Sequence, residues 1–445
     1  MRSAIALGCL ALLGVQVSGQ NLKDGQCAQN FDANTDYFPD KLQTRDDDAQ
    51  YYEIEYHNNY KLITDHRNEQ QYYLVQCGTQ PPAGLAANAI IHQVPVTNVA
   101  ALETTVVPYL EMLGVGDSIH LIADSSMVSS SCFQKYRETS NSVTELSTTN
   151  VTLANQQADA VQVQFGSSFY ITDENGTISS AAVNEPDILG RAAWLGYYAA
   201  FYNLESLANE IIADITGNYD RLKQAAGGYK DDQKPLVAWT MYDAPSQYNQ
   251  NTASWNVSVA DFKIQVTEDA GGRILKPDTL QYFKKEDFLQ ALTDVDIIID
   301  ETYVAPTFDA LMEDYGTTTG DDSSYKFIKN KRVFRTDGIL TPSGGYDWFA
   351  AAVVMGDAML SDMINVVNPS APSEDYKRIW LRNLAANESI SVTTANNCTW
   401  DESQPRPNFA ARFEGDGFSM SGASTLTAMG WTAAVLLSTA IMTLF

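Results

Sequence analysis

Histidine and cysteine are scarce in this chain of 445 residues, which contains four histidines and five cysteines. The histidines, at positions 57, 66, 92 and 120, are far apart in the sequence, and no Cys-x-x-Cys pair occurs. Zinc sites in proteins need Cys and His ligands at characteristic close spacings. A zinc centre is therefore not expected, and no other metal-ligand set is predicted.

Basic residues are also few, because 28 Lys and Arg stand against 55 Asp and Glu, which gives a formal net charge of −27 at pH 7. Proteins that bind nucleic acid neutralise its phosphates with Lys and Arg. The charge balance therefore predicts no nucleic-acid partner. Such acidity is typical of the solvated surface of a secreted protein.

Motifs of catalysis are missing as well. There is no phosphate-binding loop and no GxGxxG after an expected strand. The nearest sequence to a nucleophile elbow, Gly417-Phe-Ser-Met-Ser, lacks the final glycine. Pairs of carboxylates that could act as acid and base arise routinely on a charge-rich surface. The sequence therefore predicts neither an enzymatic activity nor a cofactor.

Both ends of the sequence are apolar. Residues 1–19 carry one arginine, a mostly apolar run over 4–17 and two small residues, which is the pattern of a secretory signal cut near Gln20. Residues 428–445 are apolar, no Lys or Arg follows them, and small residues between Gly415 and Gly422 precede them. This pattern predicts a GPI attachment signal, with a single membrane span as the alternative. We therefore expect a lipid-anchored protein on the extracellular face of the plasma membrane.

The secretory route predicts two covalent features. Removal of the signal leaves an even number of cysteines, Cys27, Cys77, Cys132 and Cys398, so two disulfides are expected, with all three pairings open. Five Asn-x-Ser/Thr sequons predict N-glycosylation. The sequons lie at Asn150, Asn175, Asn256, Asn387 and Asn397.

A long stretch near the middle of the chain has helical spacing. Apolar residues recur every three or four positions over 186–228. Asn184, Pro186 and Asp187 favour a helix start, and Gly227 favours its end. The spacing predicts one long helix, or two laid end to end, that joins two lobes. The alternative is an ordinary core helix of a single α/β domain.

Expected strands and helices alternate on both sides of this stretch, which predicts α/β lobes. Before it we expect a meander at 52–57, 60–64 and 71–77, strands at 89–96 and 119–123 and a helix at 102–113. After it we expect strands at 235–242, 295–300 and 331–336 and helices at 261–270, 284–292, 307–315 and 346–367. The predicted parts are a signal peptide (1–19), an N-terminal lobe (20–185), the joining helix (186–228), a C-terminal lobe (229–405) and a linker with the anchor signal (406–445).

The central stretch is similar to a known family. Asp187-Ile-Leu-Gly-Arg-Ala-Ala-Trp-Leu-Gly, together with 205–222, resembles the helix between the lobes of bacterial periplasmic binding proteins for iron-siderophores and cobalamin. Order and spacing carry the resemblance over 51–384, since no single motif is specific. The other matching stretches are Val99-Ala-Ala-Leu-Glu-Thr-Thr, Leu110-Glu-Met-Leu-Gly, Val266-Thr-Glu-Asp-Ala-Gly-Gly, Asp294-Val-Asp-Ile-Ile-Ile-Asp, Phe327-Ile-Lys-Asn-Lys-Arg-Val-Phe, Gly344-Gly-Tyr-Asp-Trp-Phe and Asn365-Val-Val-Asn-Pro.

The resemblance implies a class III periplasmic binding protein-like fold, in which a rigid helix joins two Rossmann-like lobes, a ligand lies between them and little hinge closure occurs. It also implies delivery to a transporter, for which Glu103 is a candidate docking residue. A lipid-anchored chain departs from the bacterial pattern. Hand-off to a reductase and uptake through an endocytic receptor are therefore alternatives to the transporter.

Loops that follow parallel strands meet at one edge of the sheet, where ligands bind. The chain places acids, hydroxyls and six aromatic rings in such loops, and flat apolar rings suit a large chelate. Packing in the core is the alternative for each ring, because Trp and Tyr are usually largely buried. The residues predicted to bind ligand are Glu103, Thr104, Asp124, Ser125, Trp239, Tyr242, Trp255, Glu301, Tyr303, Gly345, Tyr346 and Trp348.

The charge of these loops favours one class of ligand. Anionic tris-catecholate chelates need several Arg or Lys, whereas only Arg335 and Lys285 are expected nearby. The predicted ligand is therefore a neutral ferric hydroxamate siderophore, captured for uptake. Cobalamin or another metal chelate is the first alternative, and direct iron coordination by Tyr or carboxylate is a weaker one. A surface adhesion or structural protein without a ligand is the last alternative.

Overall fold

The computed structural model describes residues 20–23, 26–43, 49–172, 177–303, 307–320, 323–413 and 417–418. The predicted signal peptide, the sequon at Asn175 and the predicted anchor signal over 428–445 lie outside these residues. Within the described ranges, no helix is both long enough and apolar enough to cross a membrane.

The predicted meander forms a four-stranded sheet in the N-terminal half. Strands β1 (Tyr52–Tyr56), β2 (Tyr60–Asp65) and β3 (Gln70–Gln76) are antiparallel neighbours, and β4 (Ile90–Val94) lies parallel to β3. Tyrosine and β-branched residues recur in these strands, whose side chains alternate between the two faces. The predicted meander is therefore confirmed, and the strand expected at 89–96 joins its edge as a fourth strand, a pairing that the sequence did not predict.

A second sheet forms the core of the N-terminal lobe. Its five strands are all parallel, in the order β7-β6-β5-β8-β9. Because the carboxyl ends of parallel strands share one edge, the loops after the adjacent strands β5 and β6 open side by side. The elements are β5 (Val99–Ala101), α1 (Val106–Met112), β6 (Ile119–Ile122), α2 (Ser131–Ser140), β7 (Thr144–Glu145), α3 (Val151–Asp159), β8 (Val163–Phe165) and β9 (Thr177–Ile178).

The C-terminal lobe is built on a mixed sheet of seven strands, in the order β13-β11-β10-β14-β15-β17 with β12 beside β10. The residues of β14 are all buried, as expected for a central strand with parallel neighbours. The strands are β10 (Leu236–Asp243), β11 (Ser254–Ser258), β12 (Arg273–Ile274), β13 (Gln281–Tyr282), β14 (Ile297–Asp300), β15 (Val333–Arg335) and β17 (Arg382–Asn383). The helices between them are α6 (Asp261–Asp269), α7 (Lys285–Ala291), α8 (Phe308–Tyr315) and α9 (Lys326–Lys329).

The segment 186–228 forms two helices. They are α4 (Ile188–Tyr202) and α5 (Glu205–Ala226), and Asn203 between them takes a left-handed conformation with a φ of 59°. This conformation ends a helix, and asparagine adopts it more readily than most residues. Buried Lys61 holds the corner, because its Nζ donates to Asn203 Oδ1 at 2.8 Å and forms an ion pair with Glu205.

The two helices lie side by side and antiparallel, which corrects the expectation of a single helix or an end-to-end pair. Gly356 packs on Ile188 at the start of α4. The next residue, Asp357, accepts a hydrogen bond at 2.9 Å from Asn218, in the second half of α5. All residues of α4 are buried, so α4 is a core helix, whereas α5 keeps part of its surface exposed.

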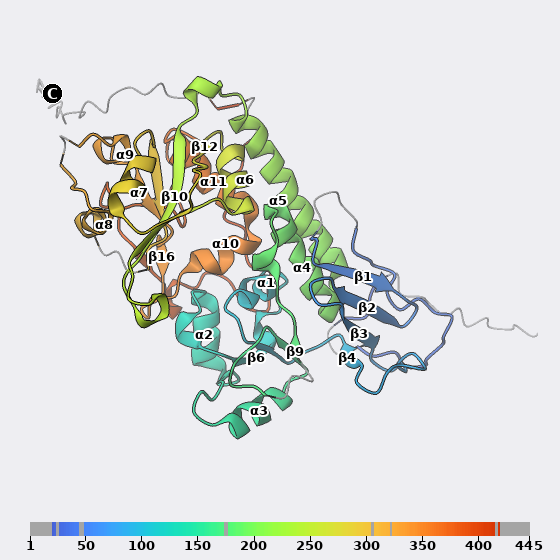
Figure 1. Ribbon diagram of the computed structural model, residues 1–445. Helices are drawn as coiled ribbons and strands as arrows, with labels where there is room; N and C mark the ends of the chain where they lie inside the picture. Colours follow the sequence, from blue (N-terminus) through green and yellow to red (C-terminus); the bar gives the residue numbers. More distant parts are fainter. Residues whose placement is uncertain are drawn as a thin grey trace, which may run out of the picture.

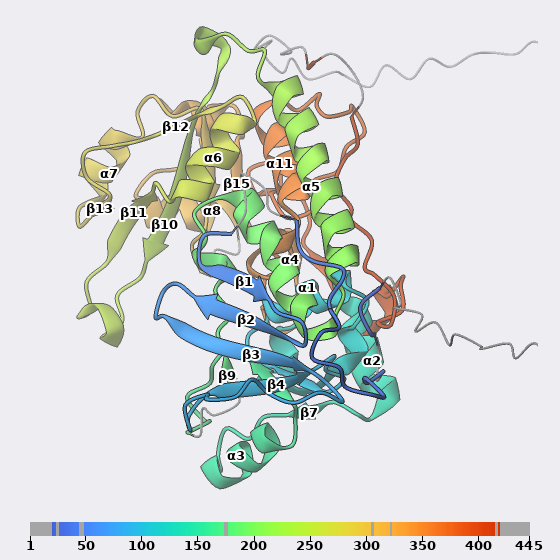
Figure 2. The same ribbon diagram turned by 90° about the vertical axis from the view of Figure 1, so that its right-hand side faces the viewer.

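Helix α5 contacts both lobes. Near its start Asn209 accepts a hydrogen bond from Gln43 N at 2.9 Å, and at its end Ala226 lies against Gly271 of the C-terminal lobe. Its 22 residues make it about 33 Å long. Figures 1 and 2 show it running alongside the C-terminal lobe and down to the N-terminal lobe. The predicted fold class, two α/β lobes joined by a long helix, is confirmed.

The helix predicted over 346–367 is interrupted. The chain makes a 3-10 turn at Asp347–Phe349, a short helix α10 (Ala351–Val354) and then α11 (Gly356–Val367). A Cβ added at Gly356 would come within 2.6 Å of Ile188 Cγ2, so the start of α11 approaches α4 more closely than a side chain permits. The apolar spacing predicted the helix, whereas packing on α4 determines where it starts.

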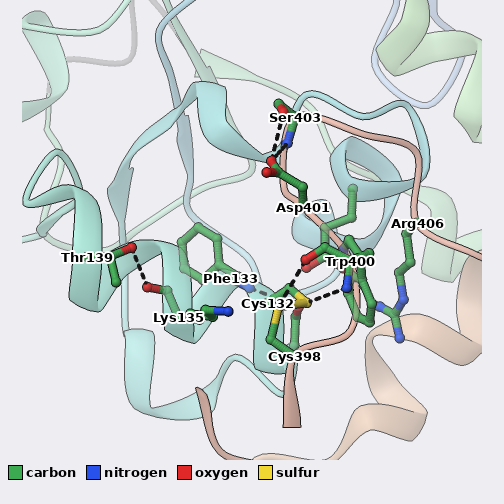
Figure 3. Close-up of a disulfide and its surroundings, with 11 residues drawn as sticks. Cys132, Phe133, Lys135, Thr139, Cys398, Trp400, Asp401, Ser403 and Arg406 are labelled. Atoms are coloured by element: carbon green, nitrogen blue, oxygen red, sulfur yellow. Dashed lines mark hydrogen bonds and ion pairs between the residues drawn. A yellow bond between two sulfur atoms is a disulfide. The ribbon is translucent and has the colours of Figure 1, made fainter. Parts of the chain in front are cut away.

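Two disulfides are present, as expected, and they pair Cys27 with Cys77 and Cys132 with Cys398. The second disulfide ties α2 to residues 395–413, which we call the C-terminal strap. Figure 3 shows this disulfide beside Trp400, whose ring stacks on the Arg406 guanidinium at 5.0 Å. The disulfide therefore attaches the C-terminal strap to the N-terminal lobe.

The C-terminal strap contacts both lobes. It follows β18 (Ser391–Val392), which pairs with β16 (Ile339–Leu340) in the C-terminal half. It then crosses to α1, where Arg406 N donates to Glu111 O at 2.8 Å. It returns to α11, where Asn408 Nδ2 donates to Asp357 at 3.0 Å. The strap therefore links the lobes by a path separate from α5.

The described sequons differ in accessibility. Asn150, Asn387 and Asn397 are exposed, whereas Asn256 is half-buried in β11. The Asn256 Nδ2 atom, to which a glycan would be attached, donates to Asp243 Oδ2 at 2.9 Å. Glycosylation stays a prediction at these four positions, and Asn256 is the least accessible of them.

Candidate functional site

A cavity of about 350 Å³ opens between the two lobes. The loops after β5 and β6 form one side, and Tyr303 after β14 forms the other side together with 344–349. Ligand sites of this size commonly lie between domains. The lining residues are Ala101, Leu102, Glu103, Thr104, Ile122, Ala123, Asp124, Met127, Tyr303, Gly344, Gly345, Tyr346 and Phe349.

Two carboxylates stand on the N-terminal side of the cavity. Glu103 Oε1 accepts a hydrogen bond from Ser167 N at 3.3 Å, and Asp124 Oδ1 accepts from Ser126 N at 2.9 Å and from its Oγ at 2.7 Å. Burial raises the pKa of Glu103, against the opposing effects of the Ser167 bond and the charge of Arg67. No lysine or arginine is among the lining residues. This side of the cavity is therefore acidic.

Three aromatic rings stand on the C-terminal side. The ring centroids of Tyr303 and Tyr346 are 6.3 Å apart, and those of Tyr346 and Phe349 are 5.6 Å apart. Tyr303 is 71% exposed and Phe349 is 52% exposed. Contiguous exposed rings mark a binding surface more often than a single exposed ring does. They offer flat apolar faces to a ligand.

The lobes touch each other directly beside the cavity. A Cβ added at Gly345 would lie 2.4 Å from Met127 O, so the two backbones approach closely. Ser129 Oγ donates to Asp347 Oδ1 at 2.5 Å, and Trp380 Nε1 donates to Asp347 Oδ2 at 2.7 Å. Asp347 is 3% exposed. A buried hydrogen-bonded carboxylate therefore joins the N-terminal lobe to the C-terminal lobe.

Half of the residues predicted to bind ligand line this cavity. The loops after the strands bring the acids and a hydroxyl of the N-terminal lobe close to two of the six predicted aromatic rings. The carboxyl ends of parallel strands share one edge of a sheet, which is why these loops meet. The predicted residues that line the cavity are Glu103, Thr104, Asp124, Tyr303, Gly345 and Tyr346.

Two predicted tryptophans are core residues instead. Trp239 is fully buried, its Nε1 donates to Thr267 Oγ1 at 3.0 Å, and Trp348 stacks on it with 6.0 Å between ring centroids. Trp239 lies within β10, where alternate side chains face the interior. Trp348 is 4% exposed because the 3-10 turn directs it inward and Phe349 outward.

The other four predicted residues also lie outside the cavity lining. Trp255, within β11, donates its Nε1 to Asp314 O at 2.8 Å, and Tyr242 packs on it with 5.3 Å between ring centroids. Glu301 forms an ion pair with Lys263. Ser125 is buried, and its N donates to Glu145 Oε1 at 3.0 Å. These side chains are held by neighbours within their own lobe.

The two cations predicted near the site do not line it. Arg335 is buried in a network with Asp300 and Asp337, and its Nε donates to Asp337 Oδ2 at 2.9 Å. Lys285 is exposed at the start of α7 and lies against Gly316. Neither residue lines the cavity, so neither compensates the two carboxylates there.

Sequence reasoning missed several lining residues. Phe349 follows Trp348 within a stretch that has helical spacing, so nothing marked it as facing the cleft. Met127 belongs to a 3-10 turn, Ser125–Met127, after β6. The only signal for these residues was their closeness in sequence to Asp124 and Tyr346, which were predicted.

A second cavity, of about 310 Å³, lies within the C-terminal half. Its arginines are already paired, since Arg378 contacts Glu388 and Arg382 contacts Asp337. No aromatic ring except that of Tyr376 lines it. The cavity between the lobes is therefore the better candidate for a ligand.

The fold and this cavity define a class, an α/β protein of two lobes with a ligand-sized cleft between them. The sequence matches no protein-family model and no curated protein. Among solved structures, a periplasmic binding protein from Veillonella parvula DSM 2008 is similar over 64% of this chain and 89% of its own, with 11% identity and a TM-score of 0.47.

Two further solved structures are similar at comparable levels. A periplasmic heme binding protein from Pseudomonas aeruginosa matches 66% of this chain and 99% of its own, with 12% identity and a TM-score of 0.43. An ABC-type Fe3+-hydroxamate transport system protein from Saccharomonospora viridis DSM 43017 matches 54% of this chain and 85% of its own, with 14% identity and a TM-score of 0.38. At these identities and scores, the likenesses do not indicate what this chain binds.

Proposed function

We propose that this protein captures a ferric hydroxamate siderophore in the cleft between its lobes, for uptake at the cell surface. The observation that carries the proposal is the cavity lining, which has three aromatic rings on one side and no lysine or arginine.

The exposed rings favour a large ligand with apolar faces. Burying an apolar surface contributes roughly 25 cal/mol per Å², and the free faces of Tyr303 and Phe349 are available for such burial. An anionic tris-catecholate would meet Glu103 and Asp124 with no compensating cation. A hydroxamate chelate, whose three ligand charges neutralise ferric iron, avoids that repulsion.

Location and delivery are part of the proposal. The apolar ends of the sequence support a secreted chain held at the plasma membrane by a lipid anchor. At the membrane, a transporter, a reductase or an endocytic receptor would take over the captured chelate.

A binding titration tests the proposal. Added ferric hydroxamate should quench the protein fluorescence in a saturable way. Replacing Tyr346 by Ala should weaken binding by about 1–3 kcal/mol, which is the usual cost of removing a central aromatic contact. Tyr248, which is 91% exposed on the β10–β11 hairpin, provides the matched control, and Tyr248→Ala should bind as tightly as the wild type.

A lack of saturable binding with any ferric hydroxamate would rule the proposal out. Cobalamin is the alternative that the same aromatic side favours, so a corrinoid belongs in the same titration. Native mass spectrometry of protein purified from its own source would show a bound small molecule directly.

A further inference from the structure

The second cavity, of about 310 Å³, has a charge opposite in sign to that of the whole chain. Three basic residues, Lys377, Arg378 and Arg382, and one acidic residue, Glu388, line it, although acids outnumber bases in the sequence by 55 to 28. None of its lining residues lines the cleft between the lobes. A ligand of this cavity would therefore be chemically different from the chelate.

Contacts within the C-terminal half hold the two arginines in place. Arg378 Nη2 donates to both carboxylate oxygens of Glu388, at 2.5 and 2.6 Å, and the guanidinium lies 5.1 Å from the centroid of the Phe334 ring. Arg382 Nε donates to Asp337 Oδ1 at 2.8 Å, and its Nη1 donates to Glu388 O at 3.0 Å. Both positive charges are therefore fixed at the wall of the cavity in advance, which lowers the cost of binding a ligand.

Several hydrogen-bond donors of the lining have no acceptor among the described residues. A guanidinium has five N–H groups, whereas that of Arg378 makes four hydrogen bonds and that of Arg382 makes three. Lys377 Nζ and the hydroxyls of Ser389 and Ser391 make none with the described part of the chain. The lining therefore offers N–H and O–H donors to a ligand.

The other acids behind the wall of the cavity are bound to other groups. Asp337 forms ion pairs with Arg335 and with Arg382. Asp362 accepts hydrogen bonds from three backbone N–H groups and one tyrosine hydroxyl. Neither carboxylate pairs with Lys377. The positive charge of this lysine is therefore available to a ligand.

Helix α11 ends beside the cavity and gives these cations a possible structural role, since basic side chains stabilise the carbonyl end of a helix. Arg332 fulfils that role, because its Nη2 donates to Val367 O at 3.0 Å. Arg378 adds a hydrogen bond from Nη1 to Asn365 Oδ1. Lys377 makes no hydrogen bond with the described residues of α11, so helix capping does not account for its place in the lining.

We infer that the second cavity binds a small oxyanion, either a phosphate group or the carboxylates of a small organic acid. The Lys377 ammonium and the free N–H groups of Arg378 and Arg382 contact its oxygens, and the hydroxyls of Ser389 and Ser391 donate to them. Hydrogen bonds between charged donors and oxyanions are among the strongest in proteins. The volume of about 310 Å³ is at the lower end for small-molecule sites, which fits a ligand of this size.

Isothermal titration of the protein with inorganic phosphate and with citrate, in iron-free buffer at fixed ionic strength, tests the inference. At least one of the two anions should bind saturably, at one site per chain. Tighter binding of phosphate would identify a phosphoryl ligand, and tighter binding of citrate would identify a carboxylate ligand. Either result supports the site.

Variants of the lining locate the binding. Lys377→Ala should weaken it about tenfold, the size expected for a hydrogen bond to a charged group. Glu388→Gln keeps an acceptor for Arg378 but removes the one negative charge of the lining. This variant should therefore bind the anion more tightly than the wild type, because it repels the anion less.

Two substitutions away from the cavity are the matched controls. Lys329→Ala on α9 and Glu53→Gln on β1 change the net charge of the chain by the same amounts, and both positions are exposed. Both control variants should keep the wild-type affinity. Melting curves of all four variants show that each is folded.

The outcomes decide the inference separately from the proposed function. A lack of saturable binding of both anions would overturn it, and so would weaker binding by Glu388→Gln. A loss of affinity in Lys329→Ala as large as that in Lys377→Ala would also overturn it, because the effect would then come from the net charge of the chain. Since the two cavities share no lining residue, none of these results changes the expectation for chelate binding in the cleft.

Discussion

Two buried glutamates face each other where the C-terminal strap meets the N-terminal lobe. Glu111 of α1 is fully buried and Glu402 of the strap is 4% exposed. Burial and the negative charge of Glu111 raise the pKa of Glu402 to about 9, and burial raises that of Glu111 as well. Arg406 Nη1 donates to Glu111 Oε2 at 2.9 Å and compensates only one charge. The pair therefore keeps a proton at neutral pH.

This shared proton predicts a pH dependence of stability. The folded pKa of Glu402, about 9, exceeds its unfolded value. The Glu402 carboxyl therefore contributes fully to stability below its pKa in the unfolded chain, roughly 4.3. This contribution is lost as the pH rises through its pKa in the folded protein. Glu402→Gln keeps a neutral side chain, so this variant should melt about 2 °C or more above the wild type at pH 9.

Thermal unfolding measured from pH 5 to pH 10 checks this expectation. Glu138, exposed on α2, provides a control of equal charge change, and Glu138→Gln should follow the wild-type curve. Parallel curves for the wild type and Glu402→Gln across the whole range would show that the pair does not share a proton.

The positions of cavity residues were predictable where backbone geometry decides them. Glu103 and Asp124 follow strands whose parallel pairing puts their carboxyl ends together. The aromatic residues were harder, because a ring in a strand and a ring in a turn look alike in sequence. Trp239 alternates into the core of its sheet, whereas Tyr346 precedes a 3-10 turn and faces the cleft.

Among the elements, the C-terminal strap depends on one covalent link. The disulfide between Cys132 and Cys398 joins residues 266 positions apart, and bonds that close long loops restrict the unfolded chain strongly. Replacing both cysteines by Ser should lower the stability by about 2–4 kcal/mol. Without the link, Trp400 loses its attachment to Cys132 of α2, so amides of the strap should exchange hydrogen faster.

Hydrogen exchange read by mass spectrometry separates this effect from general destabilisation. The variant without the Cys27–Cys77 disulfide is the control, because neither cysteine of that bond belongs to the strap. It should lose stability without faster exchange over 395–413. Unchanged strap exchange in the Cys132→Ser/Cys398→Ser variant would mean that noncovalent contacts alone hold the strap.

The arrangement of α4 and α5 shows the limit of periodicity. Apolar spacing identifies a helix and its buried face, but it does not give the direction in which the next helix runs. Two signals were present in the sequence. Asn203 is a residue type that ends helices in a left-handed conformation, and α4 is apolar around its whole circumference, which is typical of a buried core helix, unlike α5.

At the scale of the whole molecule, three separate links hold the lobes at a fixed distance. Helix α5 spans both lobes, the C-terminal strap crosses between them twice, and Asp347 joins them beside the cavity through Ser129. A hinge needs a few residues that absorb a change of backbone angles. Here the close contact of Gly345 with Met127 leaves no room for the lobes to approach further.

The molecule should therefore bind its ligand without closing. Small-angle X-ray scattering should give the same radius of gyration with and without a saturating ferric hydroxamate.

Asp347→Ala removes the acceptor of two buried donors, from Ser129 and Trp380, which should cost about 1–3 kcal/mol of stability and let the lobes separate. The affinity of this variant for the ferric hydroxamate should fall, because the two sides of the cleft would no longer be held at a fixed distance. The control variant Tyr248→Ala should change neither the radius of gyration nor the affinity. A clear decrease of the radius on binding by the wild type would contradict fixed lobes, because only closure around the ligand makes a two-lobed protein more compact.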